Sequence, residues 1–546
     1  MDDNGELVPT VAGYKYLGVD QYGSRSVTEL RGKLDKAIQK WTDFTRPNDG
    51  NDDTTHQGEP GADALIKANI TPTNFLATIR DCITSKPAYW LPTGVISLGQ
   101  ARKWDIARDK LLKQKIFRSP KVKFLPKSLI ALPAKLGGLG LPYTDFRARF
   151  APTMFLCKLI LSNEKQFSAV LDWSINGYEA KVKPEINSSN TFGWALKRCQ
   201  RNNRVFVDGA CGHLRAENRY LSNIAVESNK LGIVIKKDDQ SNWKIEMDGK
   251  HIRTYNRLKS LVRKKYSEQL IEKLKAQKSS GLWYNAIPSS LLKSKNSVNL
   301  VHLNLPMPMF RFALKARLEA LPTNAFLYYR AKTHGHAYCD LCYKERGVYQ
   351  DEWMIHALRG CPSWQGLRTR AHHDIVKFIK NFTEKWMNPG WRVLTDTMPD
   401  SAKAHWASRC ESGARLANEG TKPDLMYIND AEKKVIIAEI TVCSERRYLD
   451  RKAKKEEKYA WLARFLETES YNVTMIAWPI GHLGGVNKGD GKELLNRLGI
   501  KDAKRLTGDL QRSIQKKAIA ASYQIWVSRC RSVETIQANE RAEMLE

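Results

Sequence analysis

The sequence predicts a multidomain α+β protein in which a mostly helical region is followed by a small cysteine- and histidine-containing module and then a compact α/β unit. Its 546 residues show no internal repeat and are enough for about three or four domains of ordinary size. Apolar residues recur at helical spacing through residues 64–132 and 255–277. After residue 422 the pattern changes to two short strands, a helix and a further strand, which is typical of an α/β unit.

The N-terminal half alternates between predicted helices and short hairpins. Strand-forming residues over 6–20 predict a β-hairpin. Residues 46–63 contain almost no apolar side chain and predict a flexible insertion. Residues 148–161 predict a helix, and the alternation over 232–248 predicts a small hairpin.

The C-terminal part has a clearer pattern. The predicted elements are helices at 366–384, 402–418 and 448–467 and strands at 425–428, 435–442 and 472–480. Asn429 and Asp430 supply the turn between the first two strands.

The charge balance indicates a nucleic-acid partner. Lys and Arg total 89 against 58 acidic residues, a formal net charge of +31. The excess is uneven, with 12 basic and two acidic residues over 250–295 and 10 basic and two acidic over 101–127. Aromatic residues suited to base stacking lie among these charges: Trp104, Phe117, Phe124, Tyr255, Tyr266, Trp283 and Tyr284. The alternative is an ordinary solvated basic surface.

Membrane insertion and secretion are not expected. No run of apolar residues is long enough to suggest a membrane span. The N-terminus is polar and acidic, without the features of a secretory or transit peptide. The sequence therefore predicts a soluble intracellular protein whose cysteines are mostly reduced thiols.

A carboxylate pair is the first candidate site. Asp424 and Glu439 lie in two predicted adjacent strands joined by a short turn, so a hairpin would place them side by side. Two such carboxylates bind Mg²⁺ well, and Lys455 or Lys458 on the following helix could orient or deprotonate a water. Because the strand around Glu439 is apolar, an unpaired carboxylate there would be costly. The alternative is a glutamate paired with a neighbouring lysine.

A cysteine- and histidine-containing motif is the second candidate site. The closely spaced pair Cys339 and Cys342 is followed, after a longer gap, by His356 and then by Cys361. Three thiolates and an imidazole can enclose a tetrahedral zinc ion, and such closed sites are structural. His334 or His336 could compete for the metal.

These motifs resemble the restriction-like endonuclease of non-LTR retrotransposons, a branch of the PD-(D/E)xK nucleases that includes the element inserted in arthropod ribosomal RNA genes. The resemblance implies that Asp424 and Glu439 are catalytic magnesium ligands. The usual lysine two positions after the second acid is replaced by Thr441. In this branch the lysine lies on the following helix, which Lys455 and Lys458 would match; Lys452 and Lys454 are the competing alternatives.

The same family has a Cys-Cys-His-Cys knuckle just before the endonuclease, as in this chain. This resemblance implies a structural zinc held by Cys339, Cys342, His356 and Cys361. His373 and Asp374 are similar to the family's Arg-His-Asn/Asp motif near the knuckle. We therefore expect His373, Asp374 and Tyr459 to contact nucleic acid or support the knuckle.

The N-terminal half carries two further similarities to this family. Residues 13–19, GYKYLGV, are similar to the primer-gripping hairpin of its reverse transcriptases, and residues 137–142, GGLGLP, are similar to the run that closes the thumb. The Tyr-x-Asp-Asp loop that holds the polymerase's metal ions is absent. The implied regions are a primer-grip remnant (1–45), a disordered insertion (46–63), a thumb-like helical domain (64–160), a basic linker region (161–330), the zinc knuckle with its following helix (331–384) and the endonuclease (385–546).

The resemblance as a whole implies the C-terminal part of a retrotransposon protein. Such a protein would act in the nucleus, nick duplex target DNA, and in its parent polyprotein prime reverse transcription of the element's RNA. The alternatives are a non-catalytic nucleic-acid-binding remnant of a retroelement and a cellular resolvase or repair nuclease of the same fold.

Overall fold

The computed structural model shows a mixed α/β protein that divides into two compact units. It describes residues 14–16, 19–21, 70–84, 91, 98–118, 124–162, 224, 227–228, 230–237, 242–278, 280–408 and 422–543. The first unit comprises residues 1–69, 77–122 and 141–269, and the second comprises 70–76, 123–140 and 270–546. The boundary at residue 270 falls within a helix of the expected basic linker, so the remainder of that region belongs to the second unit.

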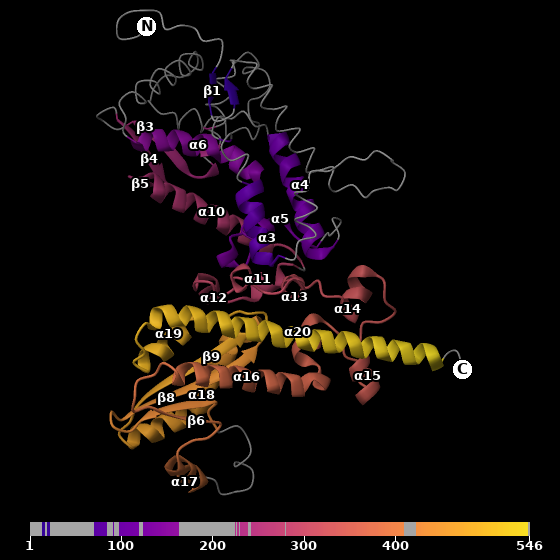
Figure 1. The fold of residues 1–546 in the computed structure, drawn as a ribbon, viewed down its shortest axis with the longest axis vertical. Coiled ribbons are helices and arrows are strands. Elements are labelled where there is room, and N and C mark those ends of the chain that lie inside the picture. The colour runs from indigo at the N-terminus through magenta and orange to yellow at the C-terminus, as the bar shows by residue number, and fades with distance from the viewer. Residues whose placement is uncertain are drawn as a thin grey trace, which may run out of the picture. The chain divides into compact units, whose positions relative to one another are not determined.

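The first unit contains two small antiparallel sheets and several helices (Figure 1). Its elements are β1 (Tyr14–Tyr16), β2 (Val19–Gln21), η1 (Ile79–Ile83), α4 (Leu98–Phe117), α6 (Thr144–Ser162), β3 (Ile233–Lys237), β4 (Trp243–Met247), β5 (Lys250–Ile252) and most of α10 (Tyr255–Lys275). The core packs the apolar faces of α6 and α10 against β3 and β4. In α4 the buried Arg108 pairs with Asp105 and Asp109, so the charge of this one basic residue is neutralised within the unit.

The described helices of the second unit that precede residue 365 are short. They are α3 (Pro72–Thr78, through residue 76), α5 (Lys127–Ala131), η4 (Ala134–Leu136), α11 (Leu282–Ala286), α12 (Ser289–Lys293), η6 (Val301–Leu303), α13 (Met307–Arg317), α14 (Asn324–Phe326), η7 (Leu327–Ala331), α15 (Asp340–Arg346), η8 (His356–Gly360) and η9 (Pro362–Trp364). Gly137 and Gly138 follow η4. Gly137 has a left-handed backbone, and a Cβ on Gly138 would overlap the carbonyl of Leu132, so both positions require glycine.

The main sheet of the second unit has the order β6-β7-β8-β9. Its strands are β6 (Arg392–Thr395), β7 (Leu425–Asn429), β8 (Lys434–Cys443) and β9 (Asn472–Gly481). β6, β7 and β8 are antiparallel neighbours, whereas β9 is parallel to β8. The parallel pair requires a crossover connection, which η10 (Glu445–Arg447) and α18 (Tyr448–Thr468) supply.

Helices cover both faces of this sheet and give three layers (Figure 1). One face packs against α16 (Gln365–Glu384), α19 (Lys488–Arg497) and α20 (Ala503–Glu543), and the other against α17 (Asp400–Ser408) and α18. Successive side chains of β7 alternate accordingly: Leu425 and Tyr427 face the first layer, and Met426 and Ile428 face the second. Because both faces are covered, the central strands β7 and β8 are mostly apolar.

The helix α20 connects several parts of the second unit. The side chain of Gln515 donates hydrogen bonds to the carbonyls of Ser297 and Gly484, both at 2.8 Å. Further along, Arg529 pairs with the buried Glu352 beside the cysteine- and histidine-containing module. The same helix therefore covers the main sheet and holds the module that precedes it.

Most predicted elements that fall on described residues are confirmed. The hairpin at 232–248 is β3 and β4, and the helices at 366–384 and 448–467 are α16 and α18. The strands at 425–428, 435–442 and 472–480 are β7, β8 and β9. Within the hairpin expected at 6–20, the described pairing joins Tyr16 to Val19. The expected insertion at 46–63 lies outside the described residues, as does the end of the helix expected at 402–418.

The interpretation of the aromatic residues requires a correction. Trp104, Trp283 and Tyr284 are buried in the cores of their units, so they cannot stack on the bases of a nucleic acid. Their aromatic rings instead pack against protein, and the guanidinium of Arg317 lies 4.4 Å from the ring centre of Trp283. None of the described helices has the length and apolar composition that crossing a membrane requires.

Candidate functional site

The strand register brings Asp424 and Glu439 to the same end of the main sheet. Leu425 pairs with Ala438, and one further step in the antiparallel register sets Asp424 opposite Glu439. Ala438 and Ile440 point to the side of α16, so the alternation of side chains directs Glu439 toward α18. The hairpin therefore brings two acids that are distant along the sequence into direct proximity.

Hydrogen bonds lock the two carboxylates together. The backbone N–H of Asp424 donates to Oε1 of Glu439 at 3.0 Å, and the N–H of Ile440 donates to Oδ2 of Asp424 at 2.7 Å. The ammonium of Lys455 lies 2.6 Å from Oε2 of Glu439. Asp424 is 7% exposed and Glu439 is fully buried. The group thus places two acids and one cation where little water can reach.

The pKa values of the two acids are shifted in opposite directions. Burial, followed by the negative charge of Asp424, raises the pKa of Glu439 against the opposing effect of Lys455. Burial also disfavours the charged form of Asp424, but the hydrogen bond and charge of His372 and the charge of Lys455 together lower its pKa. Asp424 is therefore the more readily ionised member of the pair, and Glu439 holds its proton more tightly than an exposed glutamate.

Of the lysines on α18, Lys455 is the one in contact with the carboxylate pair. Its spacing from the start of the helix places it on the side that faces β8. Lys452 pairs instead with the buried Asp490 at 2.9 Å, and Lys454 pairs with an acid one turn earlier in its own helix at 3.3 Å. The sequence alone leaves these lysines as alternatives, whereas the structure associates Lys455 with Glu439.

Tyr459 and Lys458 occupy the next turn of α18. Tyr459 is 1% exposed and its hydroxyl donates to the carbonyl of Lys422 at 2.9 Å. It therefore holds the segment that leads into Asp424 and does not offer a surface for nucleic acid, which is a different role from the one expected. The Nζ of Lys458 lies 4.8 Å from the ring centre of Tyr459, and desolvation followed by the charge of Lys455 lowers the pKa of Lys458.

The histidine that reaches the carboxylate pair is His372. Its Nε2 lies 3.1 Å from Oδ1 of Asp424. The expected residues His373 and Asp374 are on α16, and they contact none of Cys339, Cys342, His356 and Cys361 in any described hydrogen bond or ion pair. His372, which immediately precedes them, is a site residue that the sequence motifs do not indicate.

Helical spacing could have identified His372. The buried positions of α16 include Ile375, Val376 and Ile379, which lie about one and two helical turns after His372. Side chains at these spacings lie on one face of a helix. His373 is out of phase with that face, so the apolar pattern favours His372 as the residue that faces the sheet.

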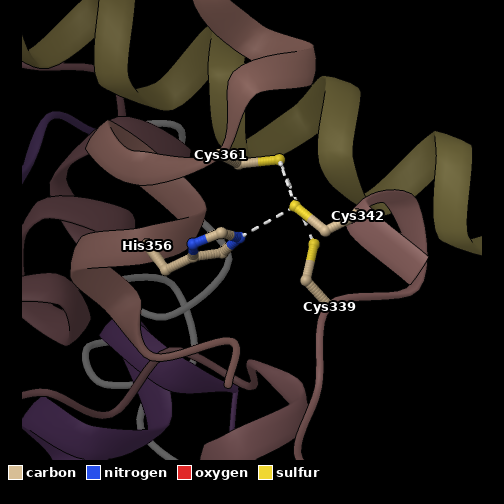
Figure 2. Close-up of side chains that lie close together, drawn as sticks. All are labelled: Cys339, Cys342, His356 and Cys361. Carbon is tan, nitrogen blue, oxygen red and sulfur yellow. Dashed lines mark hydrogen bonds between the residues drawn. The ribbon is translucent and has the colours of Figure 1, made fainter. Parts of the chain in front are cut away.

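The side chains of Cys339, Cys342, His356 and Cys361 converge on one point (Figure 2). The Sγ of Cys361 lies 4.0 Å from that of Cys339 and 3.7 Å from that of Cys342, and Nε2 of His356 lies 3.4 Å from the Sγ of Cys342. A tetrahedral ion with Zn–S bonds of about 2.3 Å requires sulfur separations of roughly 3.8 Å. The group therefore has dimensions that could hold a structural zinc ion.

Local backbone structure explains the spacing of these ligands. Cys339 is the residue immediately before α15, and Cys342, three residues later in the first turn of the helix, lies on the same side. His356 opens the π-helical turn η8, and the N–H of Cys361 closes that turn on the carbonyl of His356 at 2.7 Å. The segment between Cys342 and His356 contains the rest of α15 and a return stretch, in which Gln350 accepts a hydrogen bond from the N–H of Cys339 at 2.8 Å.

The electrostatics of the cysteines also suit a cation. The hydrogen bond from Cys339 is the main cause that lowers the pKa of Cys361. Hydrogen bonding to Cys361 raises the pKa of Cys339, and burial raises that of Cys342. Without a cation one thiolate is thus stabilised at the expense of its neighbours, and a bound metal would stabilise all three.

A scan against protein-family models and a search of curated proteins found no match to this chain. The interpretation of both sites consequently depends on their own geometry and chemistry.

We predict that Cys342→Ser lowers the zinc content of the purified chain by about one ion, because serine is a poor zinc ligand. Elemental analysis after reduction and gel filtration measures the change. Cys530→Ser is the matched control, since this thiol lies on α20 outside the cluster. Equal zinc content in the two variants would show that Cys342 is not a zinc ligand.

We predict that Glu439→Gln leaves the thermal stability at pH 7 unchanged or increases it. The raised pKa means that the folded protein binds the Glu439 proton more tightly than the unfolded chain does. This carboxyl therefore contributes most to the stability of the folded protein at low pH. The contribution is lost as the pH rises through the pKa of Glu439 in the folded protein. Glutamine remains neutral throughout this range. Thermal unfolding without added Mg²⁺ tests this, with the exposed Glu432→Gln as control; a lower midpoint at pH 7 for Glu439→Gln alone contradicts it.

Proposed function

We propose that this protein is a metal-dependent DNA endonuclease of the kind found in non-LTR retrotransposons. It would nick duplex target DNA so that the released 3′ hydroxyl primes reverse transcription of the element's RNA. The observation that carries the proposal is the buried group of Asp424, Glu439 and Lys455 at one end of the main sheet. Duplex DNA and element RNA are its proposed partners, and the nucleus is its proposed location.

The donor set supports a magnesium site. Carboxylate oxygens are the ligands that Mg²⁺ prefers, and Asp424 and Glu439 present them on adjacent strands. The pKa of Glu439 is raised by burial and by the charge of Asp424, so a divalent cation between them would relieve a repulsion that the fold creates. When bound there, Mg²⁺ would stabilise the attacking and leaving oxygens of a phosphodiester.

The protein residues would have distinct roles around the reacting phosphate. His372 holds one oxygen of Asp424, and the N–H of Ile440 holds the other, so this carboxylate has a fixed orientation. Lys455 would orient the attacking water or stabilise negative charge on the phosphate. The hydroxyl of Tyr459 fixes the backbone just before Asp424. Such fixed orientation lowers the reorganisation needed during the reaction.

Surface residues of the cysteine- and histidine-containing module support contact with nucleic acid. Tyr343 and Tyr349 are 43% and 68% exposed, and their ring centres lie 4.8 Å apart. Lys344 and Arg346 are exposed beside them. Exposed aromatic rings next to cations can stack on bases while the cations contact phosphates.

One observation favours a second candidate, a non-catalytic nucleic-acid-binding remnant. Each oxygen of Asp424 and Glu439 already has a partner within the protein, as expected for a purely structural ion pair. A carboxylate oxygen has two lone pairs, however, so these contacts leave room for coordination to a cation.

A nicking assay on supercoiled plasmid with Mg²⁺ separates the two candidates. We predict that Asp424→Asn reduces the nicking rate by at least about 100-fold, the effect of removing a charged group from a reaction centre. Lys455→Ala should cause a comparable loss, whereas Lys454→Ala on the same helix should retain activity because Lys454 pairs outside the site.

The assay requires evidence that each variant is folded, for which the circular dichroism spectrum and the zinc content serve. If wild type and folded Asp424→Asn nick at the same rate, or if neither nicks linear or supercoiled DNA while both bind it, the endonuclease proposal is wrong and the non-catalytic candidate replaces it.

A further inference from the structure

A second group of potential metal ligands lies next to the four-ligand cluster. His334 and His336 are in the loop before α15, and Asp340 is in its first turn. One ligand atom from each of these side chains lies within 4.8 Å of the others. This group is separate from the one formed by Cys339, Cys342, His356 and Cys361.

The two imidazoles carry nitrogen atoms that the protein does not satisfy. Nε2 of His334 and Nδ1 of His336 are buried, and neither has a hydrogen-bond partner in the part of the chain that the structure describes. A buried polar atom without a partner is unfavourable. Nε2 of His336 lies 3.3 Å from Oδ1 of Asp340, so the histidine nearest the helix is already aligned with the carboxylate.

A network of polar side chains orients Asp340. The amide nitrogen of Asn324 donates to Oδ2 of Asp340 and to the carbonyl of Tyr338, both at 2.9 Å. Nη2 of Arg529 donates to the amide oxygen of Asn324 at 2.9 Å, which fixes which end of the amide is the donor. Glu352 in turn pairs with Arg529. Oδ1 of Asp340 is consequently the oxygen directed toward His336, and such supporting hydrogen bonds are typical around metal ligands.

The ring of His336 is also held in place by stacking. It lies nearly parallel to the ring of Tyr338, with centres 3.9 Å apart, and the ring centre of His334 is 4.5 Å from that of His336. The imidazole orientations are thus set by packing before any ion binds. Preorganised ligands lose little conformational freedom when they coordinate a metal.

We infer that His334, His336 and Asp340 form a second metal site that binds a divalent transition-metal ion such as Zn²⁺. Two imidazoles and a carboxylate suit zinc and its neighbours in the first transition row. Three protein ligands leave at least one coordination position for water or an exogenous anion. The site would also tie the loop at residues 333–338 to α15, and it does not depend on the proposed nuclease activity.

Cobalt binding tests this inference, because Co²⁺ bound by thiolates has an intense sulfur-to-cobalt charge-transfer absorption that histidine and carboxylate ligation lacks. The full chain is depleted of metal under reducing conditions and titrated with Co²⁺. We expect the variant with both His334→Asn and His336→Asn to bind one fewer cobalt ion per chain than wild type, with its charge-transfer band unchanged. His373→Asn, on α16 and outside both clusters, is the control and should match wild type.

The retained charge-transfer band shows that the module is folded in the variant. His336→Gln alone is a second variant. We expect it to weaken binding of the second cobalt ion at least about 10-fold, because losing even an outer-shell partner of a metal ligand costs about that much affinity. Equal cobalt stoichiometry in wild type and the double variant would overturn the inference. Loss of the charge-transfer band in both variants would also overturn it, because the histidines would then belong to the cysteine site.

Discussion

The carboxylate of Glu439 lies within a strand whose flanking side chains are buried on both faces of the sheet, and an isolated charge there would be strongly unfavourable. The second unit compensates for it with a hydrogen bond from the N–H of Asp424 and an ion pair with Lys455. The arrangement depends on the antiparallel pairing of β7 with β8 and on the crossover helix α18, which returns over the face toward which Glu439 points. These compensations leave the pKa of Glu439 raised, and this residual penalty is what a bound cation would remove.

The cysteine- and histidine-containing module is attached to this sheet by defined contacts. The guanidinium of Arg359 in η8 donates to the carbonyl of Val442 at the end of β8, and Arg368 in α16 donates to the carbonyl of Cys361 at 2.7 Å. The long helix α20 covers the sheet and continues to the ion pair of Arg529 with Glu352. A metal ion in the module would therefore stabilise the segment that leads into α16, which carries His372, and the contact of Arg359 with the end of β8.

Periodicity predicted β7, β8, β9, the crossover helix and the proximity of Asp424 to Glu439, because burial on both faces makes β7 and β8 mostly apolar and the turn at Asn429 fixes their pairing. It did not predict β6, which is short and only partly buried, nor the helices α19 and α20. The choice among the lysines depended on tertiary packing, since Lys452 and Lys455 are both near enough along α18 to reach an acid and differ in which acid they meet. The sequence motifs do not indicate His372, but its phase with the buried positions of α16 places it on the face of that helix that packs against the sheet.

The most direct test of the central claim is to locate a divalent ion at the carboxylate pair. Crystals of the full chain grown with Mn²⁺, a substitute for Mg²⁺ with a usable anomalous signal, would be compared for wild type and Asp424→Asn. The account predicts an anomalous peak in contact with the carboxylate oxygens of both Asp424 and Glu439 in wild type and its loss in the variant. Ordered carboxylates with Lys455 still bound to Glu439, and no peak between them at saturating Mn²⁺, would contradict it.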